Sequence, residues 1–494
     1  MEASIPFDLV IANGRVVDPE TRLDATRNVG MNGGSIEVIS EAPLDAPTII
    51  DAAGCIVAPG FIDLHSHAQT VAGHRLQAFD GVTTALELES GASPVGMALA
   101  RAAEEGRPLN YGFSASWGLC RMHVLIDVPL SGNVGAAIAH FGDPRWQGPA
   151  SAEQVDRMLG LISEDLSAGA LGVGILVGYA QGTDPAEYSA VARLAASAKA
   201  PTFTHARDLV EVRPDVPIDG AAEIVGAASE TGAHMHYCHV NSTSTVHIDR
   251  VHGLIDRVRN EGATVSFEAY PYGAGMTVIG AQFLAPDMLA MRGLEPSDLV
   301  LPLTGERIAD AERLAWIREN EPHHTVIVEF MDDQDGLAPG GILRRALSLP
   351  GTVVASDAIF PIDTATNAFD SDAWPLPKTM RTHPRTCGTF SRSLRLLVDD
   401  VGMSWVDAVE RCTLEPARVL ESIAPAMERK GRLQPGCDAD VVVFDPKRLR
   451  DQATYQESIV PSDGVEHLLV NGVPVIRDGE LLTDARPGRA VVAG

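Results

Sequence analysis

Short apolar segments alternate with Ala-rich amphipathic segments through the middle of the chain, starting near Ile56. The apolar segments predict strands at 82–88, 171–177, 202–205, 234–240, 265–269 and 352–356. The amphipathic segments between them predict helices at 91–105, 151–167, 185–198 and 220–231. This alternation predicts an α/β fold with a parallel sheet, a (β/α)₈ TIM-like barrel. No G-x-G-x-x-G motif opens a helix, which disfavours a dinucleotide-binding domain.

The two ends of the chain have a different pattern, with short strands separated by turns. Asn13-Gly14 and Asn471-Gly472 each lie between apolar runs, which predicts hairpins. We expect both ends to form one small β-sandwich domain, built from 1–57 and 427–494, that flanks a barrel at 58–426. A polar segment around 284–350 interrupts the barrel pattern and is expected to be an insertion, which we hypothesise gates the pocket.

Composition narrows the class of protein. The chain has 494 residues, a formal charge of −28 and an isoelectric point near 4.8. This acidity argues against binding to nucleic acid or to an anionic membrane surface. Six cysteines without a C-x-x-C pair suit a reducing compartment. The N-terminus lacks the pattern of a secretory signal, and no apolar run approaches the roughly 20 residues of a membrane span. We therefore expect a soluble, cytoplasmic protein.

The first candidate for chemistry is the run Pro59-Gly60-Phe61-Ile62-Asp63-Leu64-His65-Ser66-His67. Alternate side chains of a strand point the same way, so His65 and His67 can present two imidazoles to one point. A metal site requires such convergence, although a lone His-x-His pair is often only structural.

Further polar residues close the other predicted strands. In a barrel, the carboxyl ends of the strands meet on the face that carries the active site. Histidines and carboxylates gathered there would bind a divalent ion, with Zn²⁺ expected. The candidates are His65, His67, Glu87, Glu89, His205, His239 and Asp357.

Strand alternation and position in the strand bear on His239 and Asp357. His239 follows His234 and His236, which share a strand face that His239 does not share unless the strand ends before it. Asp357 follows 352–356 and stands where a general base would lie, although an Asp at a strand end is often only a cap.

The ordered set of motifs resembles the amidohydrolase superfamily, and within it the N-acyl-D-amino-acid deacylases (D-aminoacylases). The resemblance covers nearly the whole chain. It includes the His65 and His67 motif, Gly81-Val82-Thr83-Thr84, Thr204-His205-Ala206-Arg207, His239, Ala269-Tyr270-Pro271-Tyr272, His383-Pro384-Arg385, and the tail Ala485-Arg486-Pro487-Gly488-Arg489.

The second strand departs from the deacylase pattern. The resemblance places a metal-binding Cys where this chain has Ser90, with Glu89 just before it and Glu87 on the same strand face as Glu89. A buried carboxylate costs several kcal/mol unless it is paired or binds a metal, about the penalty of an unpaired buried charge. We expect Glu89 to replace the Cys and hold the metal, with Glu87 as the second choice. The segment 171–177 contains no Lys, so a carboxylated lysine is not expected.

The second departure is at Asn241, where the deacylases usually have a Lys that grips the substrate carboxylate. Asn can form hydrogen bonds but has no charge. The resemblance leaves Tyr272 and Arg385 as further substrate-binding candidates.

These observations predict a metal-dependent hydrolase of C–N bonds, most simply an N-acyl amino acid deacylase. His65, His67, Glu89, His205, His239 and Asp357 would form a site for one or two Zn²⁺ or other divalent ions, and Asp357 would also move the proton. Hydrolysis of a cyclic amide, a dipeptide or a larger amide remains an alternative, as does an inactive scaffold. The expected partner is a small-molecule amide. Apolar residues on the barrel helices could serve a homo-oligomer interface or the barrel itself.

Overall fold

The computed structural model describes residues 7–366 and 368–494. Its central element is a sheet of eight parallel strands in the order β17-β12-β11-β10-β9-β8-β7-β6. The strands are β6 (Phe61–Asp63), β7 (Val82–Ala92), β8 (Asn110–Ser116), β9 (Val173–Ile175), β10 (Thr202–Thr204), β11 (Met235–Tyr237), β12 (Val265–Ala269) and β17 (Thr352–Val354).

The first and last strands of this sheet meet just beyond their carboxyl ends. Ser66 and Ala358 form a parallel bridge, and the His67 N–H donates to the Ala358 carbonyl at 2.8 Å. The sheet therefore comes close to a closed barrel, which confirms the predicted (β/α)₈ architecture.

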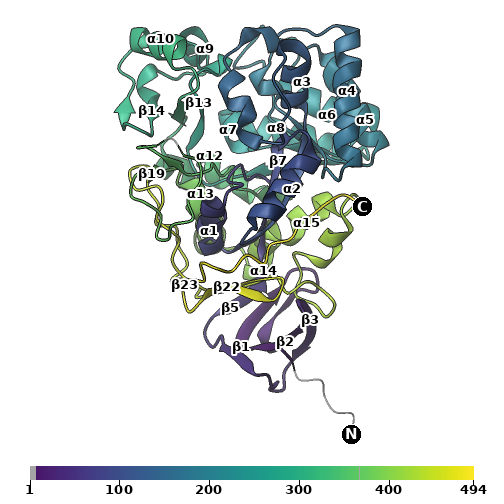
Figure 1. Cartoon of the computed structure of the whole chain (residues 1–494), viewed down its shortest axis with the longest axis vertical. Coiled ribbons are helices and arrows are strands. Elements are labelled where there is room, and N and C mark those ends of the chain that lie inside the picture. The colour runs from purple at the N-terminus through teal and green to yellow at the C-terminus, as the bar shows by residue number, and fades with distance from the viewer. Residues whose placement is uncertain (1–6, 367) are drawn as a thin grey trace.

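Helices cover the outside of the barrel (Figure 1). The four predicted helices are present, and the second begins with a capping box between Ser151 and Gln154. The helices around the barrel are α1 (Val71–Phe79), α2 (Val95–Glu105), α3 (Trp117–Ile126), α4 (Ala152–Ser167), α5 (Pro185–Ser197), α6 (Gly220–Thr231), α8 (Ile248–Asn260), α12 (Ile342–Ser348), α13 (Arg385–Arg395), α14 (Trp405–Cys412) and α15 (Leu414–Leu420).

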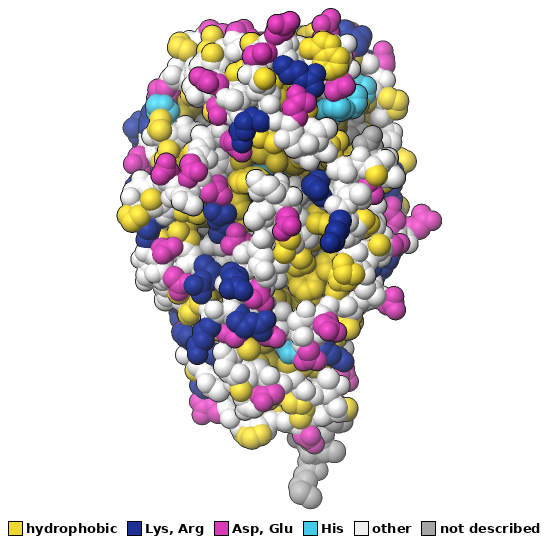
Figure 2. Space-filling view, turned by 90° about the vertical axis from the view of Figure 1, so that its left-hand side faces the viewer, with side chains coloured by type: hydrophobic (Ala, Val, Ile, Leu, Met, Phe, Trp, Pro, Cys, Tyr) yellow, Lys and Arg dark blue, Asp and Glu magenta, His cyan; other side chains and the backbone are white. Residues whose placement is uncertain are grey.

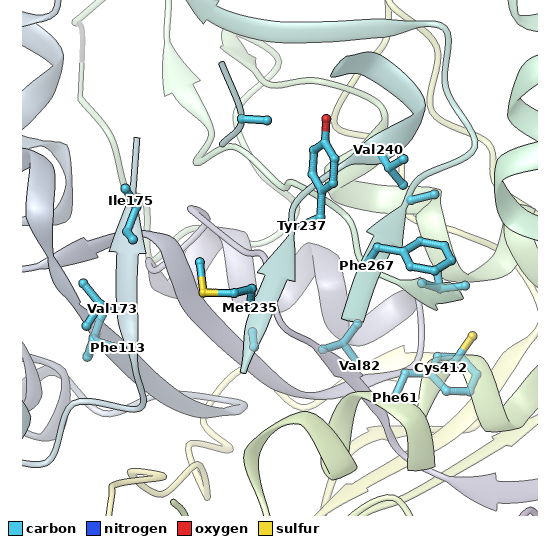
Figure 3. Close-up of a cluster of buried hydrophobic side chains, with 14 of the residues drawn as sticks. Phe61, Val82, Phe113, Val173, Ile175, Met235, Tyr237, Val240, Phe267 and Cys412 are labelled. Carbon is cyan, nitrogen blue, oxygen red and sulfur yellow. The ribbon is translucent and has the colours of Figure 1, made fainter. Parts of the chain in front are cut away.

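The hydrophobic core lies between strands and helices. Val173 and Ile175 of β9, and Met235 and Tyr237 of β11, are buried in one cluster (Figure 3). Since side chains alternate along a strand, the residues between them face the barrel interior. His236 is one of these, which is why a polar side chain can sit within an apolar strand.

One barrel strand was not predicted. Strand β8 has the sequence Asn-Tyr-Gly-Phe-Ser-Ala-Ser, which lacks an apolar run. All seven of its residues are buried. Its small and polar side chains fit the crowded interior, so tertiary packing rather than propensity makes it a strand.

As expected, both ends of the chain build the small domain together, and its strands form one continuous sheet of nine (Figure 1). β20 pairs with β5 and joins the two halves. The strands are β1 (Leu9–Asp18), β2 (Leu23–Asn32), β3 (Ser35–Ser40), β4 (Thr48–Asp51), β5 (Ile56–Pro59), β20 (Val441–Phe444), β21 (Val465–Val470), β22 (Val473–Arg477) and β23 (Glu480–Leu481).

The two Asn-Gly pairs behave differently. Asn471-Gly472 forms the predicted hairpin turn, in which Val470 pairs with Val473. The prediction of a hairpin at Asn13-Gly14 is wrong, because β1 continues through these residues and pairs with β2 on both sides of a bulge. Asn13 has a φ of 61°, which supplies the left-handed residue of the bulge. Pairing with distant strands overrides the local turn signal here.

An additional antiparallel sheet interrupts the barrel between β12 and β17, with strand order β13-β16-β14-β15. It begins at Ala274, before the expected start of the insertion near 284. With two helices it lies at the end of the molecule opposite the nine-stranded sheet (Figure 1). Its elements are β13 (Ala274–Val278), α9 (Pro286–Met291), β14 (Leu299–Leu301), β15 (Glu306–Arg307), α10 (Ala311–Asn320) and β16 (Thr325–Glu329).

Charged side chains of both signs are intermingled on the face drawn in Figure 2, despite the large net negative charge. Among the described residues, no helix is both long and apolar enough to span a membrane. Residues 1–6, on which the expectation about a secretory signal depends, lie outside the described part.

A buried ionic cluster ties the nine-stranded sheet to the barrel. One oxygen of Asp440 accepts from Lys430 Nζ at 2.6 Å and from Asn110 Nδ2 of β8 at 2.9 Å. The other oxygen accepts from the Asn471 N–H at 2.7 Å. Asp440 is only 4% exposed, so its charge depends on these partners.

We predict that Asp440→Ala lowers the free energy of unfolding by about 3–5 kcal/mol, because it leaves Lys430 buried without its closest partner. Asp438→Ala is the matched control. Asp438 also contacts Lys430, at 2.9 Å, but it is more exposed, so we expect a loss of about 1 kcal/mol or less. Urea denaturation of both variants measures the difference. Equal losses of unfolding free energy in the two variants would contradict the role of Asp440 in tying the nine-stranded sheet to the barrel.

Candidate metal centre

The predicted metal ligands converge at the carboxyl ends of the barrel strands. His65 and His67 follow β6, Glu89 lies near the end of β7, and His205 and His239 follow β10 and β11. Asp357 follows β17 and completes the group. All but His67 and His205 are less than 10% exposed. The structure thus brings together every residue predicted as a ligand.

Glu89 lies between two pairs of histidines. Its Oε2 is 3.3 Å from His65 Nε2 and 3.6 Å from His67 Nε2. Its Oε1 is 2.9 Å from His205 Nδ1 and 2.7 Å from His239 Nε2. Within each pair the two facing nitrogens are 3.1 Å apart. Each pair, together with one oxygen of Glu89, therefore has the donor set and convergence of a metal site.

Asp357 belongs to the first of these sites. Its Oδ1 is 3.4 Å from His65 Nε2 and 3.5 Å from His67 Nε2. A grouping of His65, His239 and Asp357 also has converging ligand atoms, so Asp357 faces the space between the two sites.

Two of these residues have strained backbones. His239 has a φ of 33° and Asp357 a φ of 52°, in the left-handed region that costs most residues about 1–3 kcal/mol. At His239 this turn ends the strand, since β11 stops at Tyr237. The break in alternation lets His239 reach the centre while His236 faces the interior. Strain of this kind is common where a functional group must be held in place.

The charges of the centre favour metal binding. Burial raises the pKa of Glu89, but His65, His205 and His239 outweigh it and hold that pKa well below its usual range. Burial lowers the pKa of His205 by more than Glu89 raises it, which favours the neutral imidazole that a metal requires. Burial lowers the pKa values of His65 and His67, but the surrounding carboxylates outweigh it and hold both well above the usual range. The centre therefore combines an ionised carboxylate with imidazoles that a proton or a metal ion would stabilise.

The far side of each imidazole in the first pair is held by a carboxylate. His67 Nδ1 is 2.7 Å from Glu87 Oε2, and His65 Nδ1 is 2.5 Å from Glu268 Oε1. Such contacts fix the tautomer and leave Nε2 free to face a metal. Glu87, the second choice for a ligand, thus lies behind His67 rather than between the histidine pairs.

Glu268 starts a chain of hydrogen bonds through the barrel interior. Its Oε2 contacts His236 Nε2 at 2.9 Å, and Ser266 Oγ contacts His236 Nδ1 at 2.7 Å and His234 Nε2 at 2.8 Å. This chain of hydrogen bonds was not predicted from the sequence. The polar alternation of Ser266 and Glu268 within Val-Ser-Phe-Glu-Ala is the signal that could have identified it, because it predicts two polar side chains on the inner face.

Arg385, at the start of α13, adjoins the centre. Its Nη2 is 2.8 Å from Asp357 Oδ1, and its guanidinium lies 5.0 Å from the Tyr270 ring centroid. Its Nε and Nη1 have no hydrogen-bond acceptor among the described residues. Burial alone would raise the pKa of Asp357, but Arg385 and His65 hold it far below its usual range. Asp357 is therefore ionised, and Arg385 keeps free donors.

A cavity of about 210 Å³ opens over the centre. Glu89, His205, His239, Asp357 and Arg385 line it, together with Tyr270. Residues of the insertion, including Phe283, Leu294 and Val328, form part of its wall. That the insertion moves as a gate remains a prediction.

The other predicted substrate ligands do not reach this cavity. Tyr272 is buried with its ring 4.4 Å from Arg392 and its hydroxyl 3.5 Å from Asp451. Asn241 is fully buried, and its Oδ1 accepts the Tyr270 N–H at 3.2 Å. Tyr270 is among the described residues that line the cavity, whereas Tyr272 and Asn241 are not, so their roles in substrate binding stay predictions. Strand β12 ends at Ala269, before both tyrosines, so the alternation of side chains along a strand could not predict which of them faces the cavity.

Known proteins resemble this chain over its whole length. An N-acyl-D-glutamate deacylase of Alcaligenes xylosoxydans xylosoxydans is 29% identical over 98% of this chain and 96% of that protein. A D-aminoacylase of the same organism is 27% identical over 99% of this chain and 98% of that protein.

A solved structure has the same fold. It is the N-acyl-D-glutamate deacylase of Bordetella bronchiseptica, complexed with zinc and a phosphonate inhibitor that mimics the tetrahedral intermediate. It aligns with a TM-score of 0.77 and 24% identity, over 99% of this chain and 100% of that chain. The sequence model of the amidohydrolase family matches residues 48–114 and 141–476, which are most of the chain. This chain therefore belongs to the amidohydrolase family.

Proposed function

We propose that this protein is a metal-dependent deacylase that hydrolyses the amide bond of N-acyl-D-amino acids. The observation that carries the proposal is Glu89 between two histidine pairs, with Asp357 and Arg385 beside them. The first two relatives above are named N-acyl-D-glutamate deacylase and D-aminoacylase, and these names support the choice of substrate.

We infer that Glu89 replaces the Cys of the deacylase pattern and would help to hold two ions. His65, His67 and Asp357 would hold one ion, and His205 and His239 the other. Zinc suits imidazole and carboxylate donors, and the Bordetella relative binds it. Bound metal would supply a water of lowered pKa and polarise the amide carbonyl.

Asp357 is proposed to move the proton. As an ionised carboxylate it can accept the proton of the attacking water and then donate it to the leaving nitrogen, which is too basic to depart as an anion. Arg385 contributes in two ways: it keeps Asp357 ionised, and its free donors can bind the α-carboxylate of the substrate. A linear N-acyl amino acid has this carboxylate, whereas a simple cyclic amide does not.

The cellular location is also part of the proposal. All six cysteines are free thiols, and five of them are buried. Together with the acidic charge, this supports the cytoplasm.

Glu89→Gln and Glu87→Gln form a matched pair that tests the metal assignment, because both residues are buried carboxylates on the same face of β7. We predict that Glu89→Gln loses at least one metal equivalent, since its amide cannot bridge two cations. Glu87→Gln should keep both ions with an affinity about 10–100-fold weaker, the usual effect of losing a contact behind a ligand. Elemental analysis after dialysis against defined zinc concentrations measures this. The reverse pattern would exchange the two roles.

Asp357→Asn should lower kcat by about 10²–10⁴-fold, the usual contribution of a positioned acid–base group. The thermal midpoint should change little, because the variant keeps the size of the side chain, and at saturating zinc the first ion should stay on His65, His67 and Glu89. Amine release from N-acetyl-D-leucine is the assay. Turnover close to that of the unchanged protein would rule out Asp357 as the proton carrier.

Arg385→Met should raise KM for N-acetyl-D-leucine by about 10–100-fold, which corresponds to one hydrogen bond to a charged group. The corresponding carboxamide has no carboxylate, so its KM should change far less. Arg385→Lys keeps the charge and should recover part of the loss. Equal effects on both substrates would show that Arg385 serves only Asp357.

A further inference from the structure

A second cavity of about 400 Å³ adjoins the one over the metal centre. The two cavities share six lining residues: His67, Val134, Gly135, Ile138, Thr325 and Phe360. His67 is the only one of the proposed metal ligands that lines both. The two cavities are therefore neighbours, and His67 lies at their boundary.

The wall of the second cavity is largely apolar. Phe113, Leu303, Ile362 and Phe369 contribute large side chains, and no Asp or Glu lines it among the described residues. Its two arginines lie beside partners: Arg107 Nη2 is 2.5 Å from Glu105 Oε2, and Arg101 donates to the Ser131 carbonyl. Three histidines also line it, namely His67, His323 and His324, and His324 Nδ1 is 3.1 Å from Glu321 Oε2. This environment suits an apolar group and disfavours a cation.

An exposed aromatic ring marks the cavity. Phe369 is 54% exposed, and its ring packs edge-on against Phe360 with ring centroids 5.1 Å apart. Phe360 lines both cavities. These two rings therefore offer apolar surface that a ligand could cover.

The positions of Arg385 and Asp357 indicate which half of the substrate lies in which cavity. Arg385 and Asp357 line the first cavity and not the second. In the proposed function these residues face the α-carboxylate and the leaving nitrogen. The amino acid half of the substrate therefore lies in the first cavity, and the carbonyl half points away from it, towards His67.

We propose that the second cavity is the acyl subsite, and that the acyl group of the substrate is an apolar chain or ring larger than acetyl. This inference rests on the proposed function, because the orientation follows from the roles of Arg385 and Asp357. It adds the chemical class of the acyl group, which the relatives' names leave open.

The first test compares acyl groups on one amino acid: N-acetyl-, N-butanoyl-, N-hexanoyl- and N-octanoyl-D-leucine. We expect kcat/KM of the zinc-loaded protein to rise by up to about fourfold per added methylene, the effect of burying each one. A kcat/KM that falls or stays level from acetyl to octanoyl would overturn the proposal.

Ala139→Trp tests the cavity itself. Ala139 lines the second cavity but not the first and is exposed, so a large side chain there should narrow the cavity without disturbing the core. We expect the preference of hexanoyl over acetyl to fall by at least 10-fold. Ala100→Trp is the matched control, since Ala100 is also exposed and lines neither cavity.

A second substrate series checks the orientation. N-acetyl-D-alanine, N-acetyl-D-leucine and N-acetyl-D-phenylalanine vary only the amino acid side chain. Ala139→Trp should leave their relative kcat/KM values within about twofold of the unchanged protein, because Ala139 does not line the first cavity. A loss confined to this series would place the amino acid side chain in the second cavity and overturn the proposal.

Binding separates failure of this inference from failure of the proposed function. Acetate, butanoate, hexanoate and octanoate are titrated into the zinc-loaded protein by calorimetry. If no N-acyl amino acid is hydrolysed but affinity rises with chain length and Ala139→Trp abolishes the rise, the deacylase function fails and the apolar acyl subsite stands. If N-acetyl-D-leucine is hydrolysed but chain length affects neither binding nor turnover, the deacylase function stands and the subsite fails.

Discussion

The carboxylate of Glu89 is the constraint on which the centre depends. It is buried between four imidazoles, and an isolated charge there would cost several kcal/mol, the effective penalty found for buried ions. The histidine pairs also need a partner, because in each pair two ring nitrogens face each other 3.1 Å apart. Two divalent cations would resolve both problems at once, because each would take one pair and one oxygen of Glu89. The barrel makes this arrangement available by bringing the ends of β6, β7, β10 and β11 to one face.

Charged side chains around the centre are also balanced by neighbouring groups. Glu87 and Glu268 accept from the far nitrogens of His67 and His65, which fixes the direction in which those rings face. Asp357 is balanced by Arg385, which lines the first cavity and whose Nε and Nη1 have no acceptor among the described residues. Most of the remaining wall of both cavities is apolar, although Arg207, Asp208 and Arg292 also line the first and Arg101 and Arg107 the second. A substrate with one carboxylate and otherwise apolar groups matches this distribution.

Alternating patterns made much of this predictable from the sequence. The strand at 265–269 was predicted with its observed bounds, and the choice of Glu89 over Ser90 followed from the cost of a buried carboxylate. What could not be predicted depends on contacts distant in the sequence. Asn13-Gly14 became a bulge because β1 pairs with β2 and β4, and Tyr270 rather than Tyr272 faces the cavity because the chain leaves the strand there. The role of Glu268 required knowing that its strand face is the barrel interior.

The most direct test of the central claim is the crystal structure of the zinc-loaded protein with anomalous scattering measured at the zinc edge. The account predicts two peaks, one facing His65 and His67 and the other facing His205 and His239. Each should lie about 2.0–2.2 Å from a different oxygen of Glu89, the usual zinc–carboxylate distance. Two zinc ions without Glu89 between them, or zinc bound without Glu89 as a ligand, would contradict the claim that this carboxylate replaces the missing cysteine.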